Sequence, residues 1–191
     1  MIGQRSKFVA AKGGGTVVKK LAYLSAAIYF ACGQASFADE FQNLQCGADI
    51  PKALIDKSSS NESIAGLEKK YRALGLKGLG GDELGDGLSS VSWLICGAEY
   101  IVLVDRRGLI RDVLPFPPHS KTSPAFSGTC RANGRNLPGT IVAILDGATA
   151  TDPLPVRTAW KIDRKQAKFI PASREGIACP RSGIHTVDGG P

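Results

Sequence analysis

The chain has 191 residues, of which 43% are hydrophobic, and its 24 lysine and arginine residues exceed its 17 aspartate and glutamate residues by seven. Residues 1–38 hold five of the basic residues and none of the acidic ones. The rest of the chain therefore carries 19 basic and 17 acidic side chains, a balance of +2. Because the basicity is concentrated at one end, the net charge does not favour a nucleic-acid partner, and we expect none.

The first 38 residues have the pattern of a cleaved secretory signal peptide. Five basic residues precede an apolar run from Leu21 to Ala31, and small residues follow at Ser36 and Ala38. The eleven residues of the run are too few to cross a bilayer as a helix. We expect cleavage after residue 38, a mature chain without a transmembrane span, and a periplasmic or secreted location.

Cys32 supports a second hypothesis for localisation. It stands at the end of the apolar run, where a lipoprotein signal places the cysteine that becomes lipidated. Ala31 suits such a site, whereas Tyr29 and Phe30 are larger than the residues expected there. Ordinary cleavage is therefore favoured, with lipid anchoring through Cys32 as the alternative.

Residues 39–191 are expected to form a single secreted domain with a flexible tail after about residue 180. A chain of this length buries enough surface to fold without cross-links. It begins with an expected amphipathic helix, because apolar residues recur at three- and four-residue spacing from Ile64 to Leu74. Asn61 or Ser63 would cap the start of that helix, and a glycine at position 75 would end it.

Four cysteines follow the expected cleavage site, namely Cys46, Cys96, Cys130 and Cys179. An even number in an exported chain favours two disulfides. Three connectivities are possible, and we favour Cys46 with Cys96 and Cys130 with Cys179, which would pin each terminal segment to the sheet. Since the cysteines form no C-x2-C pair and no histidine stands at ligand spacing, we expect no metal site and no cofactor.

The segment 78–87 is rich in glycine and carboxylates and is expected to be a flexible connector. It matches neither a calcium loop nor a phosphate-binding loop, because the required spacing of oxygen ligands and the Gly-Lys-Ser/Thr ending are both missing. A cation site through Asp82, Glu83 and Asp86 is the less favoured alternative.

From Ser90 onward the sequence is typical of strands. A three-strand meander is expected over 91–96, 100–104 and 109–114, and further strands over 127–132, 140–145, 156–162 and 168–170, the last two as a hairpin. A helix followed by strands predicts an α+β domain. The expected fold is one N-terminal amphipathic helix packed on an antiparallel β-meander or partial barrel, with two disulfides.

A proline-stiffened loop between two expected strands is the candidate site, because binding groups concentrate on loops held by rigid scaffolds. Phenylalanines bracket the loop as possible apolar anchors, and between them stand a histidine, a lysine and hydroxyl groups. The candidate binding residues are Phe116, His119, Ser120, Lys121, Ser123 and Phe126. They predict a non-enzymatic binding or inhibitor-like module for an extracytoplasmic protein or cell-envelope component.

The alternative function is a small periplasmic hydrolase. His119 would be its base, Ser120 or Ser123 its nucleophile, and Asp105 or Asp112 the carboxylate that orients the imidazole. The sequence has no Gly-x-Ser-x-Gly turn of the kind that presents a nucleophilic serine. We therefore assign no catalytic residue.

Overall fold

The computed structural model describes residues 41–59 and 62–185. The predicted signal peptide, the alternative anchor Cys32 and the candidate helix cap Asn61 lie outside these residues. Close to the predicted boundary of the flexible tail, η2 (Arg181–Gly183) and β12 (Ile184–His185) end the described part of the chain.

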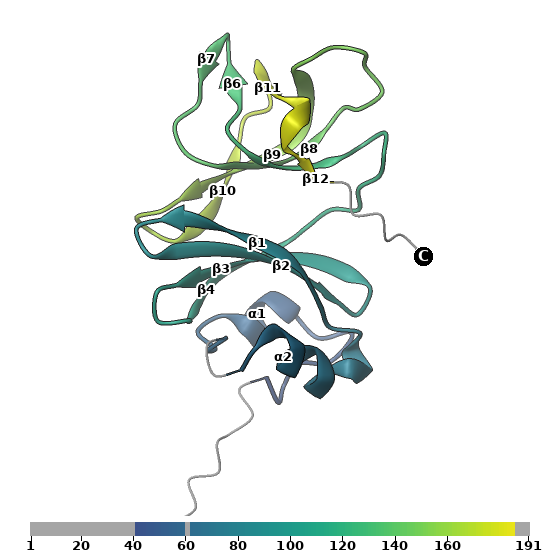
Figure 1. The fold of residues 1–191 in the computed structure, drawn as a ribbon, viewed down its shortest axis with the longest axis vertical. Coiled ribbons are helices and arrows are strands. Elements are labelled where there is room, and N and C mark those ends of the chain that lie inside the picture. The colour runs from purple at the N-terminus through teal and green to yellow at the C-terminus, as the bar shows by residue number, and fades with distance from the viewer. Residues whose placement is uncertain (1–40, 60–61, 186–191) are drawn as a thin grey trace, which may run out of the picture. The chain divides into compact units, whose positions relative to one another are not determined.

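Strands β1 to β4 form an antiparallel meander in which sequence neighbours pair (Figure 1). Their bounds are Lys77–Gly85, Leu88–Ile95, Ala98–Asp105 and Ile110–Pro115. The three predicted meander strands correspond to β2, β3 and β4. The first runs one residue past the end of β2, the second lies within β3, and the third begins one residue before β4. The first strand, β1, was not predicted.

The prediction of a flexible connector over 78–87 is wrong, because this segment forms β1 and its turn into β2. Asp86 and Gly87 both have positive φ, 56° and 72°, which suits the tight hairpin turn that an Asp-Gly pair favours. The glycines of β1 permit close pairing, since a Cβ at Gly81 would lie 2.5 Å from the carbonyl oxygen of Ser90. The glycines of β1 thus allow β1 and β2 to approach closely, and they do not make this segment a flexible connector.

The predicted α+β fold with one amphipathic helix is also wrong, because the described chain is mostly β with two antiparallel sheets and two short α-helices. Helix α1 spans Ile50–Leu54 and α2 spans Ile64–Lys70. The Ser63 side chain caps α2 by accepting from the Gly66 N–H. After α2 the expected helix continues only as the 3-10 turn η1, Arg72–Leu74, which ends at a left-handed Gly75.

The second sheet contains the strands that follow β4. Its order is β12-β5-β8-β9-β11-β6-β7, and β10 also pairs with β9. The bounds are Ala125–Gly128 for β5, Arg131–Ala132 for β6, Arg135–Asn136 for β7, Ile141–Leu145 for β8, Leu154–Asp163 for β9, Lys168–Ala172 for β10 and Ile177–Cys179 for β11. The predicted hairpin near residue 165 is therefore present as β9 and β10.

Side-chain alternation along β2 divides the first sheet into two faces. Trp93 and Ile95 join the cluster that α1 and α2 cover, whereas Leu88 joins the cluster between the two sheets. In that second cluster, Leu103 of β3 packs with Val142 and other residues of the second sheet. A third cluster lies on the other face of the second sheet and contains a disulfide.

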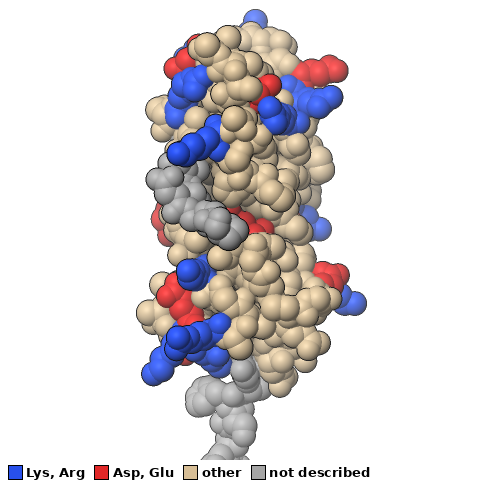
Figure 2. All heavy atoms as spheres, turned by 90° about the vertical axis from the view of Figure 1, so that its right-hand side faces the viewer, with Lys and Arg blue, Asp and Glu red and all other residues tan. Residues whose placement is uncertain are grey.

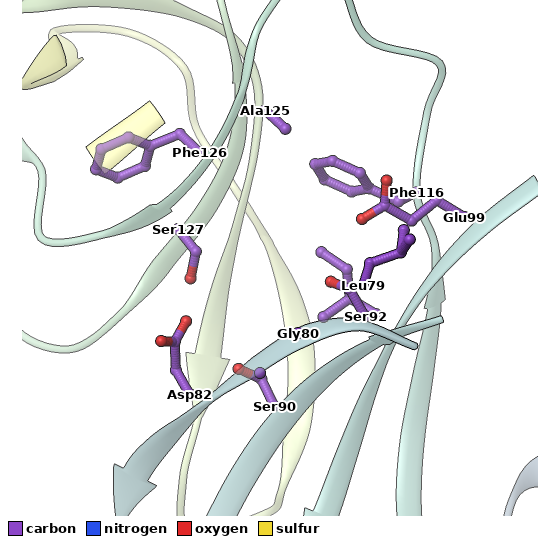
Figure 3. A pocket seen from close by; sticks show the side chains of 12 residues that line it. Leu79, Gly80, Asp82, Ser90, Ser92, Glu99, Phe116, Ala125, Phe126 and Ser127 are labelled. Atoms are coloured by element: carbon purple, nitrogen blue, oxygen red, sulfur yellow. The ribbon is translucent and has the colours of Figure 1, made fainter. Parts of the chain in front are cut away.

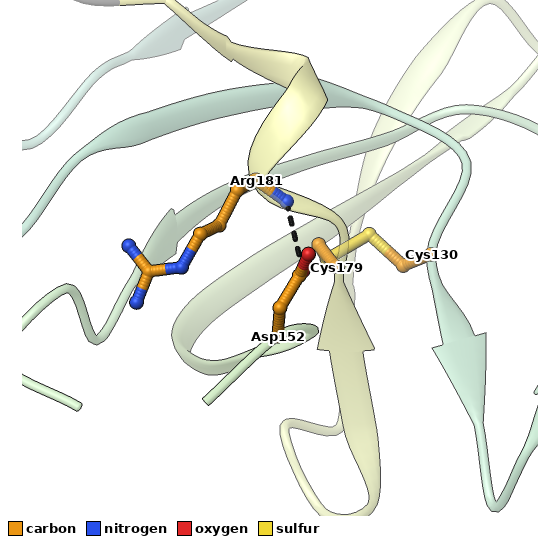
Figure 4. Close-up of a disulfide and its surroundings, with 4 residues drawn as sticks. All are labelled: Cys130, Asp152, Cys179 and Arg181. Atoms are coloured by element: carbon orange, nitrogen blue, oxygen red, sulfur yellow. Dashed lines mark hydrogen bonds between the residues drawn. A yellow bond between two sulfur atoms is a disulfide. The ribbon is translucent and has the colours of Figure 1, made fainter. Parts of the chain in front are cut away.

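Two disulfides connect segments far apart in the sequence, with the pairing that the sequence analysis favoured. Cys46 and Cys96 join the segment before α1 to the turn between β2 and β3. Cys130 and Cys179 join the segment between β5 and β6 to β11, beside the hydrogen bond that the Arg181 N–H donates to Asp152 (Figure 4).

The surface seen in Figure 2 carries basic side chains scattered among acidic and uncharged ones, without one continuous basic patch. Such a distribution offers no stripe of positive charge that would track a phosphate backbone on this face. Within residues 41–59 and 62–185, no helix has the length and apolar character needed to cross a membrane.

Replacing both Cys130 and Cys179 by serine tests the contribution of the second disulfide. The bridge closes a loop with a sequence separation of 49 residues. Chain-entropy arguments give a loss of about 4 kcal/mol in the free energy of unfolding for a loop of this size. Urea unfolding of the oxidised mature domain and of the double variant measures this loss. Equal unfolding midpoints would contradict the prediction.

Candidate functional site

The segment between β4 and β5 carries five of the six predicted binding residues and is held against the first sheet, whereas the sixth, Phe126, lies in β5. Its first backbone N–H, that of Phe116, donates to the Glu99 carbonyl at 2.8 Å. Further along, Ser120 and Ser123 exchange backbone hydrogen bonds of 3.0 Å and form a tight turn. The loop is therefore anchored at its start and closed on itself in its middle.

His119 contacts Glu99, a residue of β3. The imidazole Nε2 lies 3.6 Å from the Glu99 Oε2, and the two side chains are only 16% and 12% exposed. The contact is an ion pair when the imidazole is protonated. The His119 ring also lies against the Phe116 ring, with 5.6 Å between centroids. The structure thus places the predicted histidine beside a carboxylate rather than a hydroxyl.

A cleft of about 210 Å³ opens next to this pair, between the two sheets (Figure 3). Glu99 and Phe116 form one end of its lining. The first sheet contributes Asp82, Ser90 and Ser92, and the second contributes Ala125 and Ser127. In Figure 3 the side chains of Asp82 and Ser127 point toward one another from the two sheets.

The polar groups of the cleft are acidic or neutral. Its lining includes the carboxylates of Asp82 and Glu99 but no lysine or arginine among the described residues. Asp82 is exposed and makes no ion pair with another described residue. Ser90 is only 6% exposed, the one buried polar residue of the described chain, and its hydroxyl has no hydrogen-bond partner there. A ligand with hydrogen-bond donors and positive charge would satisfy these groups.

The two phenylalanines differ from the sequence-based expectation. Phe116 is 7% exposed and belongs to the cluster between the sheets, while Phe126 is 2% exposed and belongs to the cluster on the other face of the second sheet. Their burial fills the core at both ends of the loop. Neither side chain is available as an exposed anchor.

The two serines proposed as nucleophiles are hydrogen-bonded to residues other than His119. Ser120 shares a hydrogen bond of 3.1 Å with Thr122, and Ser123 accepts one of 2.7 Å from Arg157. Lys121 is exposed. Within the described chain, neither serine is hydrogen-bonded to His119, so the predicted serine–histidine arrangement is not assembled.

The carboxylates proposed to orient His119 are also engaged elsewhere. Asp112 accepts from the Phe169 N–H at 2.8 Å and thereby ties β4 to β10. Asp105 accepts from the N–H groups of Arg107 and Leu109 in the turn between β3 and β4. Burial alone would raise the Asp105 pKa, but these hydrogen bonds outweigh it and the pKa is lowered.

One further carboxylate stabilises the loop from the second sheet. Asp146 accepts from Arg157 at 2.9 Å, and the same guanidinium donates to Ser123. The hydrogen bond from Arg157, with a second from the Ala148 N–H, lowers the pKa of Asp146. The carboxylate therefore stays ionised to lower pH than an ordinary aspartate and holds Arg157 against the loop.

The sequence analysis missed most of the cleft. Asp82 falls in the predicted connector 78–87, and Glu99 falls between the strands predicted over 91–96 and 100–104. The usable signal was the alternation Ser90, Val91, Ser92 and Trp93, which gives one face of β2 small polar residues where a buried sheet face normally has apolar ones.

Comparison with known proteins found no matching family model, no similar curated protein and no similar solved structure. In the described part of the chain, no three or more histidine, cysteine, aspartate or glutamate residues are grouped so that they could hold a metal ion. The function therefore has to be inferred from the residues that line the cleft.

Replacing Phe116 by alanine tests whether this residue is core or surface anchor. Because its ring packs between the sheets, the free energy of unfolding should fall by about 3–5 kcal/mol. Replacing the exposed Ser120 by alanine is the matched control within the loop and should change it by less than about 0.5 kcal/mol. Urea unfolding measures both, and equal stability of the two variants would show that Phe116 is not part of the core.

Proposed function

We propose that this chain is an exported, non-enzymatic binding module that holds an extracytoplasmic protein or a cell-envelope component at the inter-sheet cleft. The observation that carries the proposal is that one cleft holds the Asp82 carboxylate, which has no ion-pair partner in the described chain, and the hydroxyl of the largely buried Ser90, which has no hydrogen-bond partner there. Neither group is held by another part of the described chain, so a ligand can bind both by displacing water from the cleft.

The form of the cleft also supports binding. Its walls are strands of two packed sheets, and its end is closed by the contacts of Glu99 with His119 and of Phe116 with the core. A site built on such elements is preorganised, so a partner that enters it loses little free energy to ordering of the protein.

Export is the setting that we propose for this binding. The signal-like pattern of residues 1–38 is one support. The other is the presence of two disulfides, since oxidising compartments are where such bridges form and persist. The proposed location is periplasmic or secreted, with lipid anchoring through Cys32 as the alternative.

A small hydrolase centred on His119 is the competing function. The contact with Glu99 is its main support, because a carboxylate beside an imidazole can orient it as a base. The hydroxyls of Ser120 and Ser123 are bonded to Thr122 and Arg157 instead, which favours binding over hydrolysis.

Quantitative capture with immobilised mature domain separates the two functions. Envelope and secreted fractions of the producing cell are passed over the wild-type protein and over Glu99→Gln, which removes one cleft charge without changing size. We expect a component that the wild type retains and Glu99→Gln loses by about tenfold or more. Glu83→Gln is the matched control, because Glu83 lies on β1 opposite Ser89, on the other face of the strand from Asp82.

Equal retention by wild type and Glu99→Gln would contradict binding at the cleft. Turnover of fluorogenic ester or amide substrates that disappears in His119→Ala would instead establish the hydrolase. The two results differ in readout, so each function can fail on its own.

A further inference from the structure

The outer edge of β1 is open from Gly80 onward, whereas the Gly78 N–H near its start donates to Glu68 of α2 at 2.9 Å. Among the described strands, β1 pairs with β2 only, and its residues from Gly80 to Glu83 are exposed. The opposite edge of the same sheet is different, because the Asp112 side chain of β4 is hydrogen-bonded to the backbone of β10. An open edge presents unpaired N–H and C=O groups to another strand.

The open edge has a regular segment flanked by irregular ones. Gly80 to Glu83 pair in register with Ser92 to Ser89, and bulges lie on either side, between Gly78 and Gly80 and between Glu83 and Gly85. Alternate residues of this segment direct their backbone groups away from β2. The face of the sheet beside this segment is open at Gly80, since a Cβ added there would meet no atom within 4 Å. The bulges limit the docking length to about four residues.

The same segment lines the cleft. Gly80, Gly81 and Asp82 form its edge, and Glu99 and Ser90 lie farther in. A strand laid beside β1 would therefore direct alternate side chains toward the cleft. At about 210 Å³ the cleft is smaller than the roughly 300 Å³ at which small-molecule pockets begin, and suits one side chain.

We propose that β1 accepts an extended peptide as a fifth strand of the first sheet and that one lysine or arginine side chain of this peptide enters the cleft. The inference rests on the proposed binding function and names its ligand class. Asp82 and Glu99 supply the negative charge, and the Ser90 hydroxyl accepts a hydrogen bond from the ammonium or guanidinium group. Backbone pairing supplies affinity, and the cleft supplies specificity.

Charge argues against a second copy of this chain as the occupant. Antiparallel pairing of β1 with itself would bring Asp82 and Glu83 of one copy close to the same residues of the other. Like charges facing one another across a strand pair are destabilising. A basic peptide has the opposite, complementary charge.

The probe is a fluorescein-labelled hexapeptide of alternating valine and threonine with one central lysine, titrated with oxidised mature domain and followed by anisotropy. A peptide with norleucine in place of lysine is its control. We expect the lysine peptide to bind about tenfold or more tightly than the norleucine peptide. Asp82→Asn and Glu99→Gln should each weaken lysine-peptide binding about fivefold or more, whereas Glu175→Gln, at an exposed residue outside both β1 and the cleft lining, should leave it within about twofold.

Two N-methylated versions of the lysine peptide test the strand itself. One carries methyl groups on the odd-numbered amides and the other on the even-numbered amides, so each blocks hydrogen bonding along one edge of the peptide. Strand addition predicts that one version loses binding and the other retains it. Equal binding of both would overturn strand addition and leave a cleft that takes a basic group alone.

Peptide binding, self-association and envelope capture together separate the proposed strand addition from the proposed binding function. No difference between lysine and norleucine peptides would overturn the charge-specific inference. A wild-type dimer in sedimentation that excludes the lysine peptide would also overturn it, because a second copy would then occupy the edge. If the hexapeptides fail to bind while envelope capture still depends on Glu99, the strand inference fails and the proposed binding function stands. If capture shows no such dependence, the proposed function fails as well.

Discussion

Packing between the two sheets is the interaction on which the rest of the described structure depends. Leu103 and Leu114 of the first sheet and Val142 and Ile144 of the second are buried in one cluster. Burial of this apolar surface is the main favourable free energy available to hold the sheets together. This packing also positions the loop that carries His119, because the loop begins at Phe116, whose ring is buried in the same cluster.

The cleft follows from an interruption of this packing. Along the face of β2 that meets the second sheet, Leu88 is buried in the core, but the next positions on that face are Ser90 and Ser92. Two small polar side chains cannot fill the space that leucine or isoleucine would fill, so the sheets leave a gap. The open edge of β1 borders the same gap, and this places backbone hydrogen-bonding groups and acidic side chains together.

The sequence predicted what depends on local pattern. Strands from residue 91 to 114, the Ser63 cap and the favoured disulfide pairing agree with the structure. Sequence-based prediction failed where contacts between distant segments determine the local structure. The glycines before Gly87 read as a connector because their close approach to β2 is a property of the pair of strands. Likewise, burial of Phe116 and the meeting of His119 with Glu99 depend on how β3, β4 and the loop pack.

Replacing Ser90 by valine tests most directly the claim that small polar residues open a binding cleft between the sheets. Valine suits a strand and fills part of the cleft, while it removes a hydroxyl that has no hydrogen-bond partner in the described chain. We expect the free energy of unfolding to stay unchanged or to rise by about 1 kcal/mol, and binding of the captured component to fall about tenfold. Wild-type binding by a stable Ser90→Val protein would contradict the account.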